Sequence, residues 1–411
     1  MEIGKEEKKY LRELAKKVAE VAQLPRQKEM AEAWRRHNSL KPGRPMILIF
    51  PEGAWSELLP EETLVVSDSF WRGVERDLRW RLYYHQHLQD DSVIDDCLRI
   101  PRAISNTGWG IEIKQIRPEE KRGACHYEPV LRKEEDLQKI RFPQVMENRE
   151  ETERRLEIAQ DIFAGILRVE LTGVTGLWFS PMDWLATWRG LDNLFLDLTE
   201  RPAWIHQVME KITTGTIFLL DQYEKSGLLS LNNGNHYVGS GALGFTDQLP
   251  QKDFDGKNVR TIDMWGHATA QIFSLVSPAM HEEFALQYEK RLLSRFGLNC
   301  YGCCEPLHKK LRQVEKIPRL RRISMSPWVD IGEAAQFIGN RFIFSWKPNP
   351  AIIAGESWEP EEARKMVRQA LSLTRGCILE IVMKDTHTCR NQPQRMSQWV
   401  KIVREEVEKF Y

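Results

Sequence analysis

The sequence lacks several features that would assign it to whole classes of protein. No run of about 18 apolar residues occurs, so we expect no transmembrane helix. The first residues, Met1 to Lys9, contain no apolar stretch, and we therefore expect no secretory signal and a cytoplasmic protein. The 59 basic and 59 acidic side chains cancel, so the overall charge gives no sign of a nucleic-acid partner.

Phosphate-binding glycine patterns and a disulfide framework are also missing. No G-x-G-x-x-G follows a first strand and no G-x-x-x-x-G-K-[ST] occurs, whereas nucleotide-binding sheets often carry one of them. The seven cysteines are an odd number, and four of them, Cys97, Cys125, Cys377 and Cys389, are widely scattered. This spacing favours reduced thiols over paired ones.

What the chain does contain is enough material for a large globular domain with an added part. Of its 411 residues, 42% are hydrophobic and 29% charged. Residues 1–43 predict a helical extension, because the segments at about 5–24 and 27–39 read as amphipathic helices. Residues 97–150 have an irregular pattern, which indicates an insertion.

From about residue 170, short apolar strands alternate with amphipathic helices at least five times. The stretches that contain the expected strands are 46–50, 169–179, 228–231, 261–267, 298–306, 323–328, 341–350 and 377–383. This alternation predicts a (β/α)8 TIM barrel over residues 44–411, and a doubly wound open sheet is the alternative. Barrel enzymes carry their chemistry in the loops that follow the strands.

The densest of these loops belongs to the stretch that begins at residue 298. Cys300, Cys303 and Cys304 fall within five positions there, and Glu305 comes next. Strand alternation would place Tyr301, Cys303 and Glu305 on one face and Cys304 on the other, unless the turn begins at Cys304. The alternative is that these cysteines are small buried apolar side chains.

Several stretches together resemble the uroporphyrinogen decarboxylase superfamily, from about residue 44 to the C-terminus. They are Arg44-Pro-Met-Ile-Leu-Ile-Phe50, Leu194-Phe-Leu-Asp-Leu-Thr-Glu-Arg-Pro202 and Val276-Ser-Pro-Ala-Met-His-Glu-Glu-Phe284. Three further motifs are similar to a long-chain subgroup, namely Tyr301-Gly-Cys-Cys-Glu-Pro306, Ser345-Trp-Lys-Pro-Asn-Pro350 and Lys384-Asp-Thr-His-Thr388. The subgroup implies corrinoid-dependent O-demethylation of methoxylated aromatic compounds in anaerobic one-carbon metabolism.

The resemblance thus implies transfer of an ether methyl group to the cobalt of a corrinoid protein. An ether methyl is a poor electrophile because its leaving group is a basic phenoxide, so a Lewis-acid metal or a general acid must activate the oxygen. Zinc bound by thiolate, imidazole and carboxylate groups would do this. No D-x-H-x-x-G corrinoid-binding pattern occurs, so we expect the cobalamin on a separate partner protein.

The zinc-dependent members of the superfamily have an H-x-C motif on one strand and a cysteine on the last strand. Here Tyr301 replaces the histidine, and Glu380 stands in the last strand with Lys384 just beyond it. The candidate metal ligands are Cys303, Cys304, His236 and His387, the candidate catalytic groups are Glu305, Lys384 and Asp385, and the candidate substrate-binding side chains are Glu52, Trp265, Trp328, Trp346 and Lys347.

Each candidate also has an ordinary structural interpretation. His236 would make hydrogen bonds within its Gly/Asn-rich loop, and the cluster at 384–387 would be a salt-bridged loop. His267, in Trp-Gly-His-Ala, is expected to begin a helix and to be structural. The tryptophans that follow strands indicate an aromatic-lined mouth for a flat ligand, although one tryptophan alone is more often part of the core.

Two other functions stay open. A metal-free decarboxylase of the same superfamily would need arginines at the barrel mouth, whereas Arg44 and Arg341 precede their strands. A non-catalytic binding protein is the third hypothesis. The first hypothesis predicts zinc, a corrinoid protein as partner, a small methoxylated aromatic substrate, and no nucleic-acid or membrane partner, with a homodimer as a further expectation.

Overall fold

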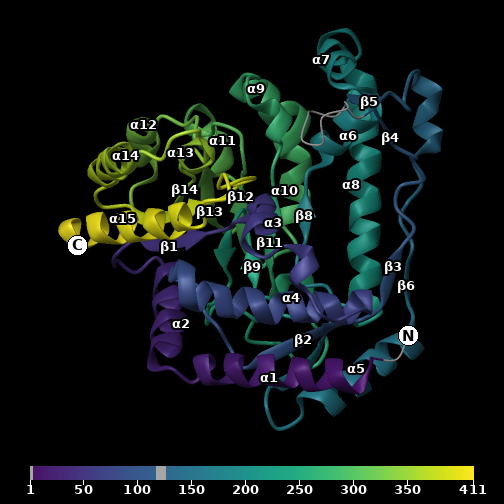
Figure 1. Cartoon of the computed structure of the whole chain (residues 1–411). Helices are drawn as coiled ribbons and strands as arrows, with labels where there is room; N and C mark the ends of the chain where they lie inside the picture. The colour runs from purple at the N-terminus through teal and green to yellow at the C-terminus, as the bar shows by residue number, and fades with distance from the viewer. Residues whose placement is uncertain (1–2, 117–125) are drawn as a thin grey trace.

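The structure is a computed structural model that describes residues 3–116 and 126–411. It confirms the α/β class and is built on a seven-stranded sheet (Figure 1). The strand order is β1 (Met46–Ile49), β15 (Ile378–Met383), β14 (Ile343–Trp346), β13 (Leu320–Met325), β12 (Leu298–Tyr301), β11 (Trp265–Ala268) and β8 (Trp178–Phe179). Because every pair is parallel, the carboxyl ends of all seven strands lie along one edge.

Strand pairing within the described ranges leaves β1 and β8 as the two edges of this sheet. Two smaller parallel pairings occur outside this sheet. β2 (Cys97–Pro101) pairs with β7 (Arg168–Thr172), and Val174 bridges Leu229. The stretch at 228–231, which the sequence predicts as a strand, forms only this bridge.

The seven-stranded sheet is strongly curled. β12 and β15 are three places apart in the strand order, a separation of about 14 Å in a flat sheet. Yet the segment from Gly239 to Gly241, which spans at most about 7 Å, reaches both strands. A Cβ on Gly239 would stand 2.9 Å from Cys300 Sγ, and one on Gly241 would stand 2.9 Å from Val382 Cγ1. The sheet therefore wraps around a concave face on which side chains converge.

Alternation along the strands separates this concave face from a convex one covered by helices. Leu379, Ile381 and Met383 of β15 lie in the largest apolar core, with residues of α14 (Pro360–Leu373) and α15 (Gln394–Phe410). Val382 lies in a separate buried cluster on the concave side. Every residue of β15 is buried, as expected for a parallel sheet covered on both faces, although the concave side also carries the charged Glu380.

The N-terminal extension contributes to the concave core. α1 (Lys5–Ala22) lies alongside α4 (Ser69–Tyr83), and both belong to one apolar cluster (Figure 1). α2 (Pro25–Asn38) ends in two buried polar residues, His37 and Asn38. His37 Nε2 lies 3.0 Å from Glu380 Oε2, and Asn38 Oδ1 accepts a hydrogen bond from Arg322 Nη2 at 2.6 Å.

The other elements connect these parts. They are α3 (Trp55–Leu58), α5 (Arg149–Phe163), α6 (Pro181–Arg189), α7 (Leu191–Glu200), α8 (Pro202–Lys225), α9 (Pro278–His281), α10 (Gln287–Leu293), α11 (Leu311–Val314), α12 (Ile331–Ile338), α13 (Ala351–Ala354), β3 (Ile104–Asn106), β4 (Lys114–Ile116), β5 (His126–Glu128), β6 (Val145–Glu147), β9 (Tyr237–Val238) and β10 (Ala242–Leu243). Over the described ranges, no helix combines the length and the apolarity that a membrane span requires.

The predicted insertion at 97–150 needs a correction. It begins with β2, whose pairing with β7 makes it a regular strand rather than an irregular segment. Its remainder forms short antiparallel pairs, β3 with β6 and β4 with β5. Residues 117–125, which include Cys125, lie outside the described residues.

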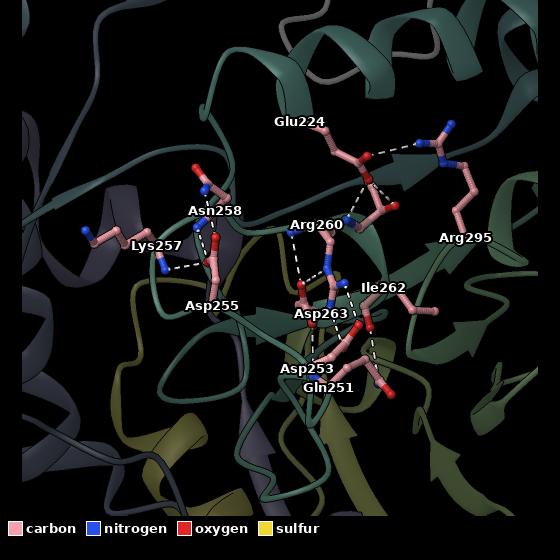
Figure 2. A network of polar contacts seen from close by, with 11 residues as sticks. Glu224, Gln251, Asp253, Asp255, Lys257, Asn258, Arg260, Ile262, Asp263 and Arg295 are labelled. Carbon is pink, nitrogen blue, oxygen red and sulfur yellow. Dashed lines mark hydrogen bonds and ion pairs between the residues drawn. The ribbon is translucent and has the colours of Figure 1, made fainter.

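The loop before β11 is held by a network of charged side chains (Figure 2). Arg260 pairs with both Asp253 and Asp263, and Glu224 of α8 accepts hydrogen bonds from Thr261 and pairs with Arg295. These contacts join the loop to α8 and to the end of α10, and they anchor the start of β11.

Candidate active site

A buried polar cluster lies where the carboxyl ends of β12, β14 and β15 converge. We call Ser240, Cys303, Lys347 and Lys384 the thiol–lysine cluster, and all four side chains are buried. Lys384 Nζ lies 3.3 Å from Ser240 Oγ and 3.9 Å from Cys303 Sγ. The Ser240 hydroxyl donates to the same sulfur at 3.2 Å. An ammonium group, a hydroxyl and a thiol are therefore close together at the edge where parallel sheets carry their chemistry.

The turn after β12 aims Cys303 into this cluster. β12 ends at Tyr301, and Gly302 follows with φ 90°, a conformation that favours glycine. Tyr301 lies on the convex side, where its hydroxyl donates to Glu289 Oε2 at 2.7 Å and contacts His281 Nε2 at 2.7 Å. The predicted common face for Tyr301 and Cys303 is wrong, because strand alternation stops at Gly302.

Glycine spacing places Ser240 in the same space. Gly239 and Gly241 have φ angles of 62° and 101°, and both approach the sheet too closely for a side chain. With Gly244 they form the spacing G-x-G-x-x-G, the pattern of a dinucleotide-binding turn. No helix follows directly, however. Gly239 and Gly241 instead allow the backbone to pack closely against Cys300 and Val382.

The thiol of Cys303 is the one that ionises most easily. A hydrogen bond from the Cys304 thiol, 3.5 Å away, is the largest cause that lowers the pKa of Cys303 to about 7. Burial opposes this shift, while the charge of Lys384 and the hydroxyl of Ser240 support it. The pKa of Cys304 is correspondingly raised. The pair therefore holds one thiolate near neutral pH, on Cys303.

Lys347 is the group that can exchange a proton near neutral pH. Burial lowers its pKa to about 8, Glu380 opposes the shift, and the like charge of Lys384 adds to it. Its ammonium group donates to the carbonyl oxygen of Ser345 at 3.2 Å and to the hydroxyl of the same residue. A pKa close to the working pH is what a general acid requires.

Lys384 is a stable cation. Burial alone would lower its pKa, but interactions with Tyr237, Cys303, Asp385 and Glu52 raise the pKa above its ordinary value. Asp385 Oδ1 lies 3.7 Å from Lys384 Nζ and is 44% exposed. Lys384 thus provides a fixed positive charge between the buried thiolate and the more exposed carboxylates.

Four further predicted residues lie in the loops that follow β1, β12 and β15. Cys304 Sγ lies 4.0 Å from Asp385 Oδ2. Burial raises the pKa of Glu52, and its carboxylate interacts with Lys384 and Asp385. A Cβ on Gly53 would stand 3.0 Å from His387 Nδ1, so the two loops are in contact. Four predicted residues, Glu52, Cys304, Asp385 and His387, therefore lie close to the thiol–lysine cluster.

His236 does not join this cluster. Burial lowers its pKa to about 4, and the charges that act on it next are those of Arg99, Glu170 and Asp95. Arg99 and Glu170 belong to the separate pair β2–β7. Both ring nitrogens of His236 are buried without a hydrogen-bond partner within the described part of the chain. The predicted ligand thus belongs to a different part of the molecule.

His267 takes the place that the sequence suggested for His236. The helix predicted to begin there is wrong, because His267 lies in β11 and pairs with Trp178 and Cys300 of the neighbouring strands. Burial lowers its pKa to about 3, and the charges of Lys347 and Lys384 act in the same direction. In the chain as described, no well-aligned hydrogen bond reaches either ring nitrogen, but the backbone of Cys300 lies close enough to the ring to oppose the shift. Its alternation with Trp265 in a buried strand is the signal that would have found it.

The predicted tryptophans do not line a common mouth. Trp265 is buried on the concave side, where Arg322 Cζ lies 5.4 Å from its ring centroid. Trp346 is buried in the convex core among the helices. Trp328 is 70% exposed. Two of the three are core residues, because strand alternation and burial separate them from the loops.

Two predicted carboxylates have structural partners. Glu305 Oε1 accepts from Thr269 Oγ1 at 2.7 Å, and Glu305 Oε2 accepts from the Cys303 backbone N–H at 2.9 Å. It therefore fixes the loop that carries Cys303. Burial would raise the pKa of Glu380, but the charge of Arg322 leads the opposing causes and lowers it to about 2. Glu380 is bonded to Arg322 Nε at 2.8 Å and to His37, so its oxygens are occupied.

These positions do not fit the zinc site that the resemblance implies. Cys303, Cys304 and Asp385 lie together, but His236 lies elsewhere and His387 is exposed. The ammonium group of Lys384 stands beside Cys303, where it competes with a metal for the thiolate. Within residues 3–116 and 126–411, no group of three or more His, Cys, Asp or Glu side chains is arranged to hold a metal ion.

Comparison with known proteins gives similarity to solved structures alone. No protein-family model matches the chain, and no curated protein matches it. Among solved structures, a methyltransferase from Methanosarcina mazei is similar, with 11% sequence identity and a TM-score of 0.49. The match covers 93% of this chain and 99% of that one. A similarity at this level carries no argument about the reaction.

Proposed function

We propose that the protein is a methyltransferase with a (β/α)8 barrel. In this proposal it removes the methyl group of a methoxylated aromatic compound and passes it to the cobalt of a separate corrinoid protein. The thiol–lysine cluster at the carboxyl ends of parallel strands is the observation that carries the proposal. The curled sheet and the pair β2–β7 support the barrel, because they supply wall segments between the two sheet edges.

Lys347 is the general acid in this proposal. With a pKa of about 8 it is largely protonated at neutral pH and still a competent donor. A proton from Lys347 Nζ to the ether oxygen converts the leaving group from phenoxide to phenol while the oxygen–methyl bond breaks. A corrinoid on the partner protein would supply the cobalt nucleophile to which the methyl group passes. Lys347 is then reprotonated from water.

Lys384 and Cys303 prepare the site for an anionic aromatic substrate. Lys384 remains positively charged and binds a carboxylate of the substrate, in competition with the Cys303 thiolate. His267 is neutral and buried, and its ring lies within the influence of Lys347 and Lys384. No step is assigned to zinc, because the candidate ligands do not converge.

The test is a methyl-transfer assay with defined components. The purified protein is mixed with a panel of methoxybenzoates and reduced cobalamin, and methylcobalamin and the phenol product are both measured. We expect the two products in equal amounts, and a Lys347→Met variant should be slower by about 10² to 10⁴-fold. Lys365→Met, at a largely exposed position on α14, is the matched control and should keep full activity. An unchanged rate in Lys347→Met would contradict the assignment.

Decarboxylation without a cofactor is the second candidate function. Lys347 and Lys384 are buried, and the described residues around them hold no convergent set of metal ligands, which suits a site that binds a carboxylate and protonates a carbanion. The same protein incubated with aromatic acids in the absence of cobalamin would then release carbon dioxide. Carbon dioxide without methylcobalamin would favour this second function over the first.

A further inference from the structure

A cavity of about 670 Å3 lies apart from the thiol–lysine cluster. Its walls come from α4, β2 and the segments around 92–94 and 235–243, and none of the four cluster residues lines it. The volume falls within the range of about 300–1,000 Å3 that small-molecule sites occupy. Three aromatic side chains, Phe50, Phe70 and Tyr84, line it together with aliphatic ones and with the ion pair of Asp77 and Arg81, which are 2.8 Å apart. These features suit a flat, mostly apolar ligand.

One wall residue keeps the cavity open at a cost to its helix. Gly73 lies inside α4, where glycine is less favourable than alanine. It lines the cavity, and a Cβ built on it would meet nothing within 4 Å. Any larger side chain at this position would extend into open space and narrow the cavity. α4 therefore carries glycine, which is unfavourable inside a helix, at the place where a side chain would compete with a ligand.

A second wall residue offers an unused hydrogen bond. Arg99 lines the cavity and binds Asp95 with both terminal nitrogens, at 3.2 and 2.7 Å. Its Nε atom is buried and has no hydrogen-bond partner in the described chain. A buried donor without a partner is unfavourable, and an acceptor on a ligand would satisfy it. His236, which follows the wall residue Asn235, has two further buried and unpartnered nitrogens and lies within the influence of Arg99.

We propose that this cavity binds a small aromatic carboxylate. The aromatic ring lies among Phe50, Phe70 and Tyr84, and the carboxylate accepts a charge-assisted hydrogen bond from Arg99 Nε. The inference is independent of the proposed reaction, because binding is measured without turnover.

The cavity is next to the candidate active site, and the aromatic rings of Phe50 and Tyr237 separate the two. Phe50, in the cavity wall, contacts Tyr237 with ring centroids 5.4 Å apart. Burial raises the pKa of Tyr237 to about 12, and the charges of Lys384 and Cys303 also act on it. A carboxylate that binds to Arg99 is therefore distinguishable from one that binds to Lys384, because different side chains hold the two.

The experiment is a calorimetric titration of the full-length protein with benzoate, 2-naphthoate and, as an uncharged analogue, benzamide. Wild-type protein should bind the carboxylates more tightly than benzamide. Gly73→Leu, which fills the cavity, should lower the affinity for the carboxylates at least tenfold. Gly73→Ala, the matched control, adds one methyl group and should change it less than threefold. Arg99→Met should remove the preference for benzoate over benzamide.

Three results would overturn the proposal. One is the absence of measurable binding to wild-type protein at millimolar carboxylate. Another is unchanged affinity in Gly73→Leu, and the third is loss of binding in Lys384→Met with no loss in Gly73→Leu, which would place the ligand in the thiol–lysine cluster. Circular dichroism checks the fold of each variant, and the two glycine variants decide the matter even where Arg99→Met fails to fold.

Discussion

Cys303 differs from the other buried cysteines in the balance between burial and hydrogen bonding. Burial raises the pKa of Cys97, Cys377 and Cys389 to about 11 in each case. In Cys303 the hydrogen bond from Cys304 outweighs burial. Alone among these, it is ionised near neutral pH, and a thiolate is the reactive form.

This contrast predicts a selective alkylation. Iodoacetamide should modify Cys303 before Cys97, Cys377 and Cys389, with a rate that rises with pH around a midpoint near 7. Cys304→Ala removes the leading hydrogen bond, so the midpoint should move to higher pH. Peptide mass spectrometry over a pH series measures both effects. A midpoint that stays in place in Cys304→Ala would show that another group lowers the pKa.

The acid role proposed for Lys347 predicts the pH dependence of the proposed methyl transfer. A general acid acts in its protonated form, so the rate should fall as pH rises through about 8, the pKa that burial gives Lys347. Initial rates measured from about pH 6 to pH 10 test this prediction. Lys347→Arg keeps the charge but stays protonated throughout, so the fall near pH 8 should disappear. A wild-type rate that increases across pH 8 would assign the proton transfer to another residue.

At the scale of strands, the pair Arg322–Glu380 connects β13 with β15 across the concave face. Arg322→Met should lower the free energy of unfolding by about 3–5 kcal/mol, because it leaves a buried carboxylate without its main partner. The effect requires an ionised Glu380, whose pKa is lowered to about 2. The contribution should therefore be present above about pH 4.5 and be lost as pH falls toward 2.

Urea unfolding measures the effect, and a surface pair provides the control. Arg341 pairs with Glu315 at 2.8 Å but is 49% exposed. Arg341→Met should cost at most about 1 kcal/mol. Equal losses in the two variants would mean that Arg322 does not act through its buried pair.

Local patterns predicted the elements better than they predicted the site. The helices predicted at about 5–24 and 27–39 are confirmed to within two residues as α1 and α2, because the apolar period of the first is clear and Pro25 separates the two. Cys303 and Lys384 do meet, since the carboxyl ends of parallel strands lie along one edge. Which loops converge depends on the curl of the sheet and on strand pairing. Neither is visible in local pattern, so His236 was placed in the site and His267 was not.

At the scale of the whole molecule, the helical extension is part of the barrel-like core. His37 and Asn38 satisfy the buried charges of Glu380 and Arg322. A chain without residues 1–43 would leave those charges short of partners and expose the apolar surface that α1 covers. It should therefore lose cooperative unfolding rather than behave as a trimmed domain. Thermal and urea unfolding of the truncated chain test this expectation.

A point variant on the same helix provides the comparison. Glu29 is exposed on α2, and Glu29→Ala should change the free energy of unfolding by no more than about 0.5 kcal/mol. A truncated chain as stable as this variant would show that the extension is dispensable.

The contact between His37 and Glu380 also determines when the chain can finish folding. The two residues are 343 positions apart, so the docking site of α2 is incomplete until β15 has been synthesised. At common translation rates that interval lasts roughly 20 to 70 seconds. During it, α1 can already pack against α4, but the end of α2 has no final partner. The nascent protein therefore exposes the end of α2 for most of its synthesis, and its last strand completes the site for that helix.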